Sequence, residues 1–241
     1  MIEHRPFASL GAVSSDWLKA RLHFRVGNIG RADHAPLGAL HVLNDDEFAP
    51  HSGFGLHPHR NVEIVTWVRS GAITHEDDAG NQARLVAGSL QVMSAGAGVH
   101  HAERNAEAVP ARLFQLWLTP RTMGGAARWA ARCCSQASRE GKFVTLASAD
   151  PNDIGAGALP INANARVRLA TLRESTRIVY PLPASTVAYL VTDHGAVNVG
   201  DVRLEAREGA VIRDESAVSL EANKDTDVLL VELTTGADAI D

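Results

Sequence analysis

The sequence predicts an all-β protein that contains two tandem copies of one barrel or jelly-roll unit. Strand-like runs rich in β-branched and aromatic residues are short, and turn-forming residues interrupt them at intervals of roughly eight to twelve residues. The second half also repeats turn motifs of the first half, which indicates an internal duplication. With 241 residues, the chain is long enough for two domains of ordinary size.

The strand-like runs concentrate in the middle of the first half, after weakly patterned residues 1–36. A cluster of Asn44, Asp45 and Asp46 is expected to end the first run, because short polar side chains favour turns. Residues 77–81 predict a hairpin loop. One helix is expected, over the alanine- and arginine-rich residues 125–135, as a connection between the units. The expected strands are residues 38–43, 62–68, 71–75, 82–86, 90–93 and 113–118.

The internal repeat rests on two turn motifs. Residues 68–72 match residues 192–196, and residues 85–89 match residues 206–210. The interval between the motif glycines is shorter in the second half, which a tighter hairpin at Gly200 would accommodate. We therefore expect an N-terminal domain over residues 1–124 and a C-terminal domain over residues 125–241.

Two pairs of potential metal ligands lie in the first half, and each pair has a spacing of two residues. His57 and His59 form one pair, and His101 and Glu103 form the other. Residues two apart on a strand share a face, so facing strands would bring three imidazoles and a carboxylate together. This ligand set suits Fe(II), Mn(II), Ni(II), Co(II) or Zn(II), and a six-coordinate ion would keep open positions for a substrate or O₂.

Other ligand-type side chains compete with this set. Glu63 shares a face with the first pair, but on an unbroken strand it would lie roughly 13 Å beyond His59. It is therefore expected to play a supporting or structural role. His100 should point away from His101, and His75 lies on a hairpin arm, so each is a weaker candidate for the cavity. His41 and His51 precede the motif and are interpreted as incidental.

The second half lacks a matching set of ligands. Projecting the first-half positions through the repeat places Pro181 and Pro183 at one ligand pair, and Ala222 and Lys224 at the other. His194 is the only histidine after His101. The C-terminal copy is therefore expected to be a scaffold or a binding surface without a metal.

Composition excludes several classes of protein. A formal net charge of −5 argues against nucleic acid as the main partner, which requires clustered basic residues. No apolar run is long enough to cross a bilayer, and no secretory signal is recognised at the N-terminus. The adjacent Cys133 and Cys134 are too close for an ordinary disulfide and are expected to be reduced thiols, with a redox pair as the weaker alternative. A cytoplasmic location is expected.

The residues around the proposed ligands resemble known sequence motifs. Residues 53–59, followed by Glu63 and Gly71, look like the first cupin motif, and residues 88–105 look like a variant of the second, with Ser94 where proline is usual. More narrowly, the chain resembles the pirin family. The segments that carry this resemblance are residues 43–46, 57–60, 63–66, 93–96 and 101–103.

This resemblance implies a bicupin fold with one metal, usually iron, in the N-terminal domain. Its ligands would be the residues matching His57, His59, His101 and Glu103. Some pirins cleave quercetin with O₂, as quercetin 2,3-dioxygenases, and others act as transcriptional cofactors. The chain departs from the family pattern at residues 22–26, where pirins usually show His-Thr-Phe-Ser-Phe, and at Asn61, where aspartate is common.

The leading hypothesis is therefore a pirin-type dioxygenase that acts on quercetin or a similar flavonol with O₂. The cofactor is expected to be one divalent ion, Fe(II) first, with Ni, Mn, Co, Cu or Zn as alternatives. Glu103 would also relay the substrate proton. The alternatives are a non-catalytic, metal-dependent regulator that binds a protein partner, or another cupin enzyme acting on a small carbonyl compound. A monomer is expected.

Overall fold

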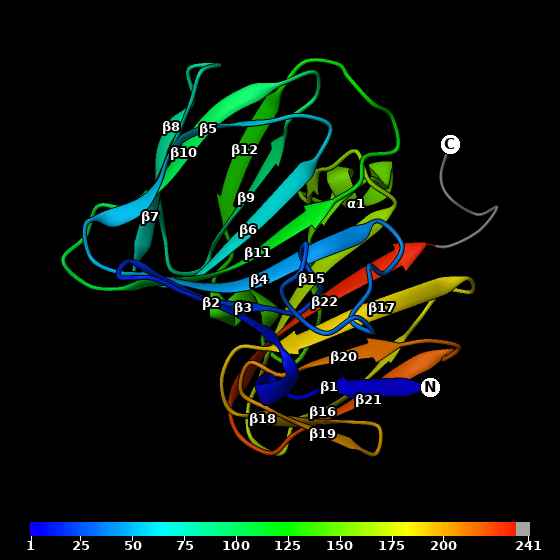
Figure 1. Cartoon of the computed structure of the whole chain (residues 1–241). Helices are drawn as coiled ribbons and strands as arrows, with labels where there is room; N and C mark the ends of the chain where they lie inside the picture. The colour runs from blue at the N-terminus through cyan, green and yellow to red at the C-terminus, as the bar shows by residue number, and fades with distance from the viewer. Residues whose placement is uncertain (235–241) are drawn as a thin grey trace. The chain divides into compact units, whose positions relative to one another are not determined.

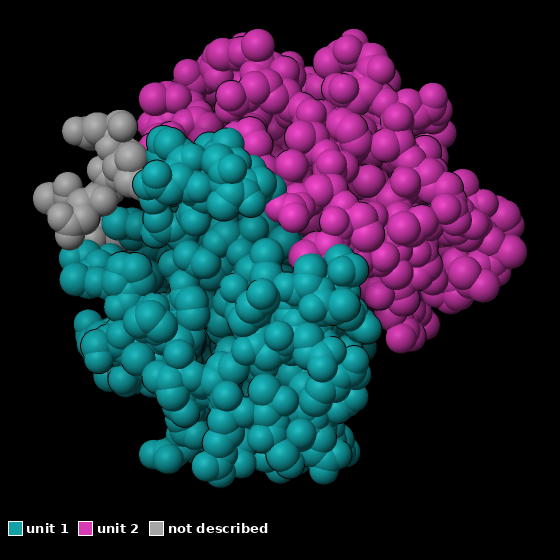
Figure 2. Space-filling view, turned by 180° about the vertical axis from the view of Figure 1, so that it is seen from behind, with its two compact units in different colours: residues 1–10, 135–158, 164–241 teal, residues 11–134, 159–163 magenta. Residues whose placement is uncertain are grey.

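The computed structural model of the chain describes residues 1–234. Two compact units can be distinguished (Figure 2). The N-terminal unit comprises Gly11–Cys134 and Leu159–Ala163, and the C-terminal unit comprises Met1–Leu10, Ser135–Ala158 and the described part of Asn164–Asp241. These units interleave in sequence, whereas the expected ranges 1–124 and 125–241 divide the chain at a single point. None of the helices within the described range is long and apolar enough to span a membrane.

The N-terminal unit contains two antiparallel sheets (Figure 1). One has the strand order β12-β9-β6-β11-β4-β3-β2, and the other has the order β5-β10-β7-β8. The strands are β2 (Gly11–Ser14), β3 (Leu18–Leu22), β4 (Leu40–Phe48), β5 (Ser52–His59), β6 (Glu63–Ser70), β7 (Ala72–Asp77), β8 (Gln82–Val86), β9 (Ser89–Ser94), β10 (Val99–Asn105), β11 (Ala111–Leu118), β12 (Arg128–Cys133) and β14 (Leu159–Pro160).

The C-terminal unit has a corresponding pair of sheets, with the orders β1-β20-β17-β22-β15-β13 and β16-β21-β18-β19. Its helical elements are short: two 3₁₀ turns at Phe7–Ser9 and Gln136–Arg139, and α1 (Pro151–Gly155). The strands are β1 (Ile2–Arg5), β13 (Val144–Ser148), β15 (Ala165–Leu172), β16 (Arg177–Pro181), β17 (Thr186–Thr192), β18 (Ala196–Val199), β19 (Val202–Glu205), β20 (Gly209–Ile212), β21 (Ala217–Ala222) and β22 (Thr226–Thr234).

The central strands of the two units follow matching orders. The order β5-β10-β7-β8 corresponds to β16-β21-β18-β19, and β9-β6-β11-β4 corresponds to β20-β17-β22-β15. The repeated glycines occupy the same turn, since Gly71 precedes β7 and Gly195 precedes β18. The prediction of an all-β protein with two tandem jelly-roll units is confirmed.

Two local predictions were wrong. Residues 125–135 do not form a helix, because β12 extends through Arg128–Cys133 and pairs antiparallel with β9. Trp129 and Ala131 pack against the buried cluster beneath this strand, so tertiary contacts override the helical preference of the alanines. The cluster at Asn44 does not end a strand either, because β4 continues to Phe48. There the buried carboxylate of Asp45 accepts a hydrogen bond from Arg69, which compensates its burial.

Candidate metal centre

The pairing of β5 with β10 brings three histidines together. His101 lies directly opposite His57 in the antiparallel register, and Val99 lies opposite His59. The ring centroids of His57 and His101 are 4.5 Å apart, and that of His59 is 4.8 Å from His57 and 4.9 Å from His101. Each of the three residues offers a ring nitrogen within 4.8 Å of those of the other two. The predicted convergence of the imidazoles is present.

A β-bulge separates the two predicted ligands of β10. The register shifts between His101 and Glu103, so that Glu103 lies opposite Phe54 on β5. The backbones of β5 and β10 approach closely here. A Cβ at Gly53, whose φ is +139°, would collide with the carbonyl of Glu103. A bulge locally increases twist and redirects side chains. Glu103 is therefore directed differently from a residue on an unbroken ladder.

The Glu103 carboxylate is buried and accepts hydrogen bonds on both oxygens. Gln91 Nε2 donates to Oε1 at 2.5 Å, and Gln115 Nε2 donates to Oε2 at 2.6 Å. Thr66 Oγ1 also donates to Oε1, at 3.3 Å. Burial raises the pKa of Glu103, while the hydrogen bond from Gln115 opposes this shift.

Glu103 belongs to a second group of potential ligands. Its carboxylate oxygen lies within 4.8 Å of ligand atoms of both His75 and His101, since His75 is its register partner on β7. Among the described residues of the N-terminal unit, the close groups are thus the three histidines of β5 and β10, and the set of His75, His101 and Glu103. His101 belongs to both groups and is the central residue of the site.

Two of the imidazoles, those of His59 and His101, are held in the neutral form, which is the form that binds metals. Burial, together with the neighbouring imidazole of His57, lowers the pKa of His59 to about 4. Burial and the charges of the surrounding histidines lower the pKa of His101 to about 3. At neutral pH, protons therefore do not compete with a cation for these two rings.

The donor set fits a divalent metal ion. Both ring nitrogens of His101 are buried without a hydrogen-bond partner, which is costly for a polar group unless a ligand satisfies it. His57 contacts the Gly55 carbonyl through Nδ1 at 2.8 Å; donation by Nδ1–H leaves the lone pair on Nε2 available to a metal. Such second contacts commonly fix the tautomer of a metal-binding histidine.

A cavity of about 300 Å³ is lined by His57, His59 and Glu103. Aliphatic side chains from β2 to β4 form most of the rest of its wall. Two of its polar groups, Asn44 Oδ1 and Asp46 Oδ1, are buried without a hydrogen-bond partner. Burial and the nearby carboxylates of Asp45 and Glu103 raise the pKa of Asp46 to about 8, so its side chain is largely a neutral acid at pH 7.

The competing residues are located elsewhere, with one exception. Glu63 accepts hydrogen bonds from Ser94 Oγ at 2.6 Å and from the backbone N–H of Asn162 at 3.0 Å, so it anchors the segment that contains β14. His100 is exposed and contacts Asp78. His75 is the exception: it is fully buried, and its Nε2 contacts Asp77 at 3.1 Å.

Sequence reasoning missed the polar residues that surround Glu103. Gln91 lies between Leu90 and Val92, and Gln115 lies between Phe114 and Leu116, in strands that are otherwise almost entirely buried. A single amide in a buried strand requires a hydrogen-bond partner. This signal was available in the sequence, but it does not identify the partner.

The C-terminal unit also contains a close group of potential ligands, namely Asp193, His194 and Asp227. In this group Asp227 forms an ion pair with Arg139 at 2.6 Å and accepts a hydrogen bond from Thr171 at 2.5 Å. His194 is exposed and contacts Asp193. The arginine already compensates the buried carboxylate, so the group does not resemble the site around His101.

Comparisons with known proteins agree with this architecture. A family model described as Pirin matches residues 4–118, and one described as Quercetinase C-terminal cupin domain matches residues 145–233. A pirin-like protein from Caulobacter vibrioides is 47% identical over 232 residues, covering 96% of this chain and 99% of the relative.

Two Escherichia coli proteins extend the comparison. A protein named quercetin 2,3-dioxygenase from strain K12 is 31% identical, with 97% of this chain and 99% of the relative covered. The crystal structure of the bacterial pirin YhhW in complex with nickel(II) superimposes with a TM-score of 0.90 at 30% identity, covering 98% of this chain and all of that one (100%). These matches, together with a fold that contains two copies of one cupin unit, show that the chain belongs to the pirin family.

Proposed function

We propose that the chain is a divalent-metal-dependent dioxygenase that cleaves quercetin or a similar flavonol with O₂. The carrying observation is the position of His57, His59 and His101, whose ring nitrogens converge beside an apolar cavity that His57 and His59 line. The relative named quercetin 2,3-dioxygenase supports the substrate class, and the nickel(II) complex of YhhW supports a divalent ion.

The three histidines would hold the ion together with Glu103. A divalent ion bound there supplies a Lewis acid that favours ionisation of an enol hydroxyl and orients the reactants. Fe(II) remains the first expectation, and nickel is the ion found in the relative. Sites made of imidazole and carboxylate ligands bind all of these divalent metals in the same general order of affinity. The ligand set alone therefore does not select one metal.

The side chains of the cavity would bind and orient the substrate. A wall of leucine, valine and isoleucine side chains suits a flat aromatic ligand and excludes water. The unpartnered oxygens of Asn44 and Asp46 can each accept a hydrogen bond from a ring hydroxyl. Glu103 also lines this cavity, where one of its oxygens would receive the proton released by the enol hydroxyl.

The test is aerobic turnover of quercetin by protein loaded with Fe(II) or Ni(II), followed by O₂ consumption and by loss of the flavonol absorbance. His101→Ala should abolish turnover and weaken metal binding by more than about 100-fold, since removal of an outer contact already costs roughly 10- to 100-fold. His194→Ala, in the C-terminal unit, is the matched control and should behave as the parent protein.

Equal turnover by the parent and by His101→Ala would refute the proposed site. Metal binding that depends on His101 without any O₂ consumption would refute the dioxygenase. That second result would favour the alternative of a metal-dependent regulator, which the same preparations could then test with a protein partner.

A further inference from the structure

Two tryptophan–glutamine pairs contact Glu103, one at each carboxylate oxygen. Trp129 Nε1 donates to Gln91 Oε1 at 2.9 Å, and Gln91 Nε2 donates to Glu103 Oε1. Trp117 Nε1 donates to Gln115 Oε1 at 3.0 Å, and Gln115 Nε2 donates to Glu103 Oε2. Each carboxylate oxygen is thus connected through one amide to one indole.

The chemistry of these groups fixes the direction of each bond. An indole N–H can only donate, so the end of each glutamine that faces a tryptophan must be its carbonyl oxygen. The NH₂ group of each glutamine then faces Glu103, and an NH₂ group can only donate. Both carboxylate oxygens must therefore accept, which fixes the plane of the carboxylate and favours its ionised form.

We propose that Gln91 and Gln115 are positioning residues that orient the Glu103 carboxylate for metal binding, and that Trp129 and Trp117 hold these amides in place. The inference rests on the proposed ligation of the metal by Glu103. Without the indoles, each amide could rotate about its terminal bond and present its carbonyl oxygen to the carboxylate. Two acceptors would then face each other, and the carboxylate would turn away or take up a proton.

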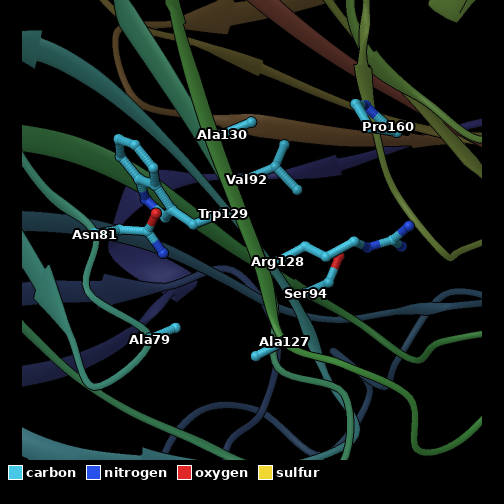
Figure 3. A pocket seen from close by; sticks show the side chains of 9 residues that line it. All are labelled: Ala79, Asn81, Val92, Ser94, Ala127, Arg128, Trp129, Ala130 and Pro160. Atoms are coloured by element: carbon cyan, nitrogen blue, oxygen red, sulfur yellow. The ribbon is translucent and has the colours of Figure 1, made fainter.

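The side chains of the two tryptophans lie in different surroundings. Trp117 lines the cavity, and its ring lies edge-on to His59 at 5.0 Å. Trp129 stacks on His75 at 5.1 Å with an interplanar angle of 17°. It lines a separate open groove of about 470 Å³, where Figure 3 shows it on the same strand as Arg128. Trp129 is therefore the cleaner position to test, because it does not line the substrate cavity.

The experiment removes each indole N–H while keeping an aromatic ring. Trp129→Phe, Trp117→Phe and the double variant are titrated with Co(II), and the dissociation constant and the visible absorption spectrum of the bound ion are recorded. Trp17→Phe is the matched control, because Trp17 packs against Phe48 and Phe54 in the same unit and donates no hydrogen bond to this network. Thermal unfolding of each metal-free variant is measured in parallel.

We expect each single variant to weaken Co(II) binding by about tenfold, and the double variant by up to about 100-fold, the usual range for contacts behind a ligand. The Co(II) spectrum should change in the double variant, because the coordination geometry changes. Trp17→Phe should keep both the dissociation constant and the spectrum. A purely structural role would lower the unfolding temperature of the metal-free protein and leave the affinity and spectrum unchanged, and this result would overturn the proposal.

Glu103→Ala separates this inference from the dioxygenase. If that variant binds Co(II) as tightly as the parent, Glu103 is no ligand and the positioning role fails with it. If the tryptophan variants behave as expected but the parent protein consumes no O₂ with quercetin, the positioning role holds and only the proposed activity fails.

Discussion

The two units use the same strand order to build different interiors. In the N-terminal unit, β5 and β10 direct His57 and His101 toward each other. In the C-terminal unit, the corresponding strands β16 and β21 pair Tyr180 with Val218 and Ile178 with Leu220. These side chains belong to or pack against one continuous apolar cluster.

The difference separates the strand order, which both units share, from the polar interior residues of the site, which lie in the N-terminal unit. The C-terminal unit closes its sheets around aliphatic side chains, so this strand order is compatible with an apolar interior. The N-terminal unit accepts imidazoles, amides and carboxylates at interior positions, and each requires a partner to offset its burial. The site is thus an elaboration of a unit whose apolar version is present in the same chain.

The largest expected effect comes from introducing the chemistry of one unit into the other. Leu220→His places an imidazole in the apolar cluster, which supplies no ligand or hydrogen-bond partner. We expect a loss of about 3 kcal/mol or more in the unfolding free energy of the C-terminal unit, measured by urea denaturation. Ser219→His is the control, since Ser219 is exposed on the same strand. Equal losses in both variants would contradict the difference between the interiors.

A smaller effect is expected at the turn that the two units share. Gly71 and Gly195 both have positive φ values, +70° and +67°. A Cβ at Gly71 would lie 2.6 Å from the Pro110 carbonyl oxygen, and one at Gly195 would collide with the Asp225 carbonyl. Alanine at either position should cost about 1–3 kcal/mol, measured by thermal and chemical denaturation.

The control for this turn is Gly155→Ala, because Gly155 has neither a positive φ nor a neighbour within 4 Å of a new Cβ. It should change the stability by less than about 0.5 kcal/mol. Sizeable destabilisation at only one of the two turn glycines would show that the repeated sequence does not carry the same constraint in both units.

The smallest effect concerns the protonation of histidines, which NMR titration of the metal-free protein measures. His59 and His101 should stay neutral until the pH falls to about 4 and about 3, whereas the pKa of His194 is raised by its hydrogen bond to Asp193. The lowered values destabilise the N-terminal unit as the pH falls below about 6.5. The His194 pair has the opposite sign, because its stabilisation is lost as the pH rises through the raised pKa. Titration of His101 above His194 would contradict this contrast.

The convergence of histidines was predictable because it follows from strand periodicity and from one pairing of two strands. Residues two apart on β5 share a face whatever the rest of the fold does. The role of Glu103 was predicted from the same rule, but the structure adds a bulge after His101 that the rule cannot detect. The bulge places Glu103 beside His75, which sequence reasoning had ranked low.

The strand at residues 128–133 and the partners of Glu103 depend on contacts distant in sequence. Alanine-rich segments favour helices locally, and only pairing with β9 makes β12 a strand. Gln91 and Gln115 are 24 residues apart in sequence, yet both donate to Glu103, and each lies 12 residues from it along the chain. Sequence periodicity predicts which face of the sheet a residue occupies. It does not predict which residues of other strands lie next to it on that face.

The position of β1 bears on how the chain is made. β1 pairs with β20 in the C-terminal unit, although residues 6–208 separate the two strands in sequence. Its partner exists only after residues 209–212 have been synthesised, so β1 lacks this pairing until then. Without β1, β20 has no neighbour on that side, and an open edge invites pairing with other chains. A fragment that begins at residue 135 would keep this open edge permanently.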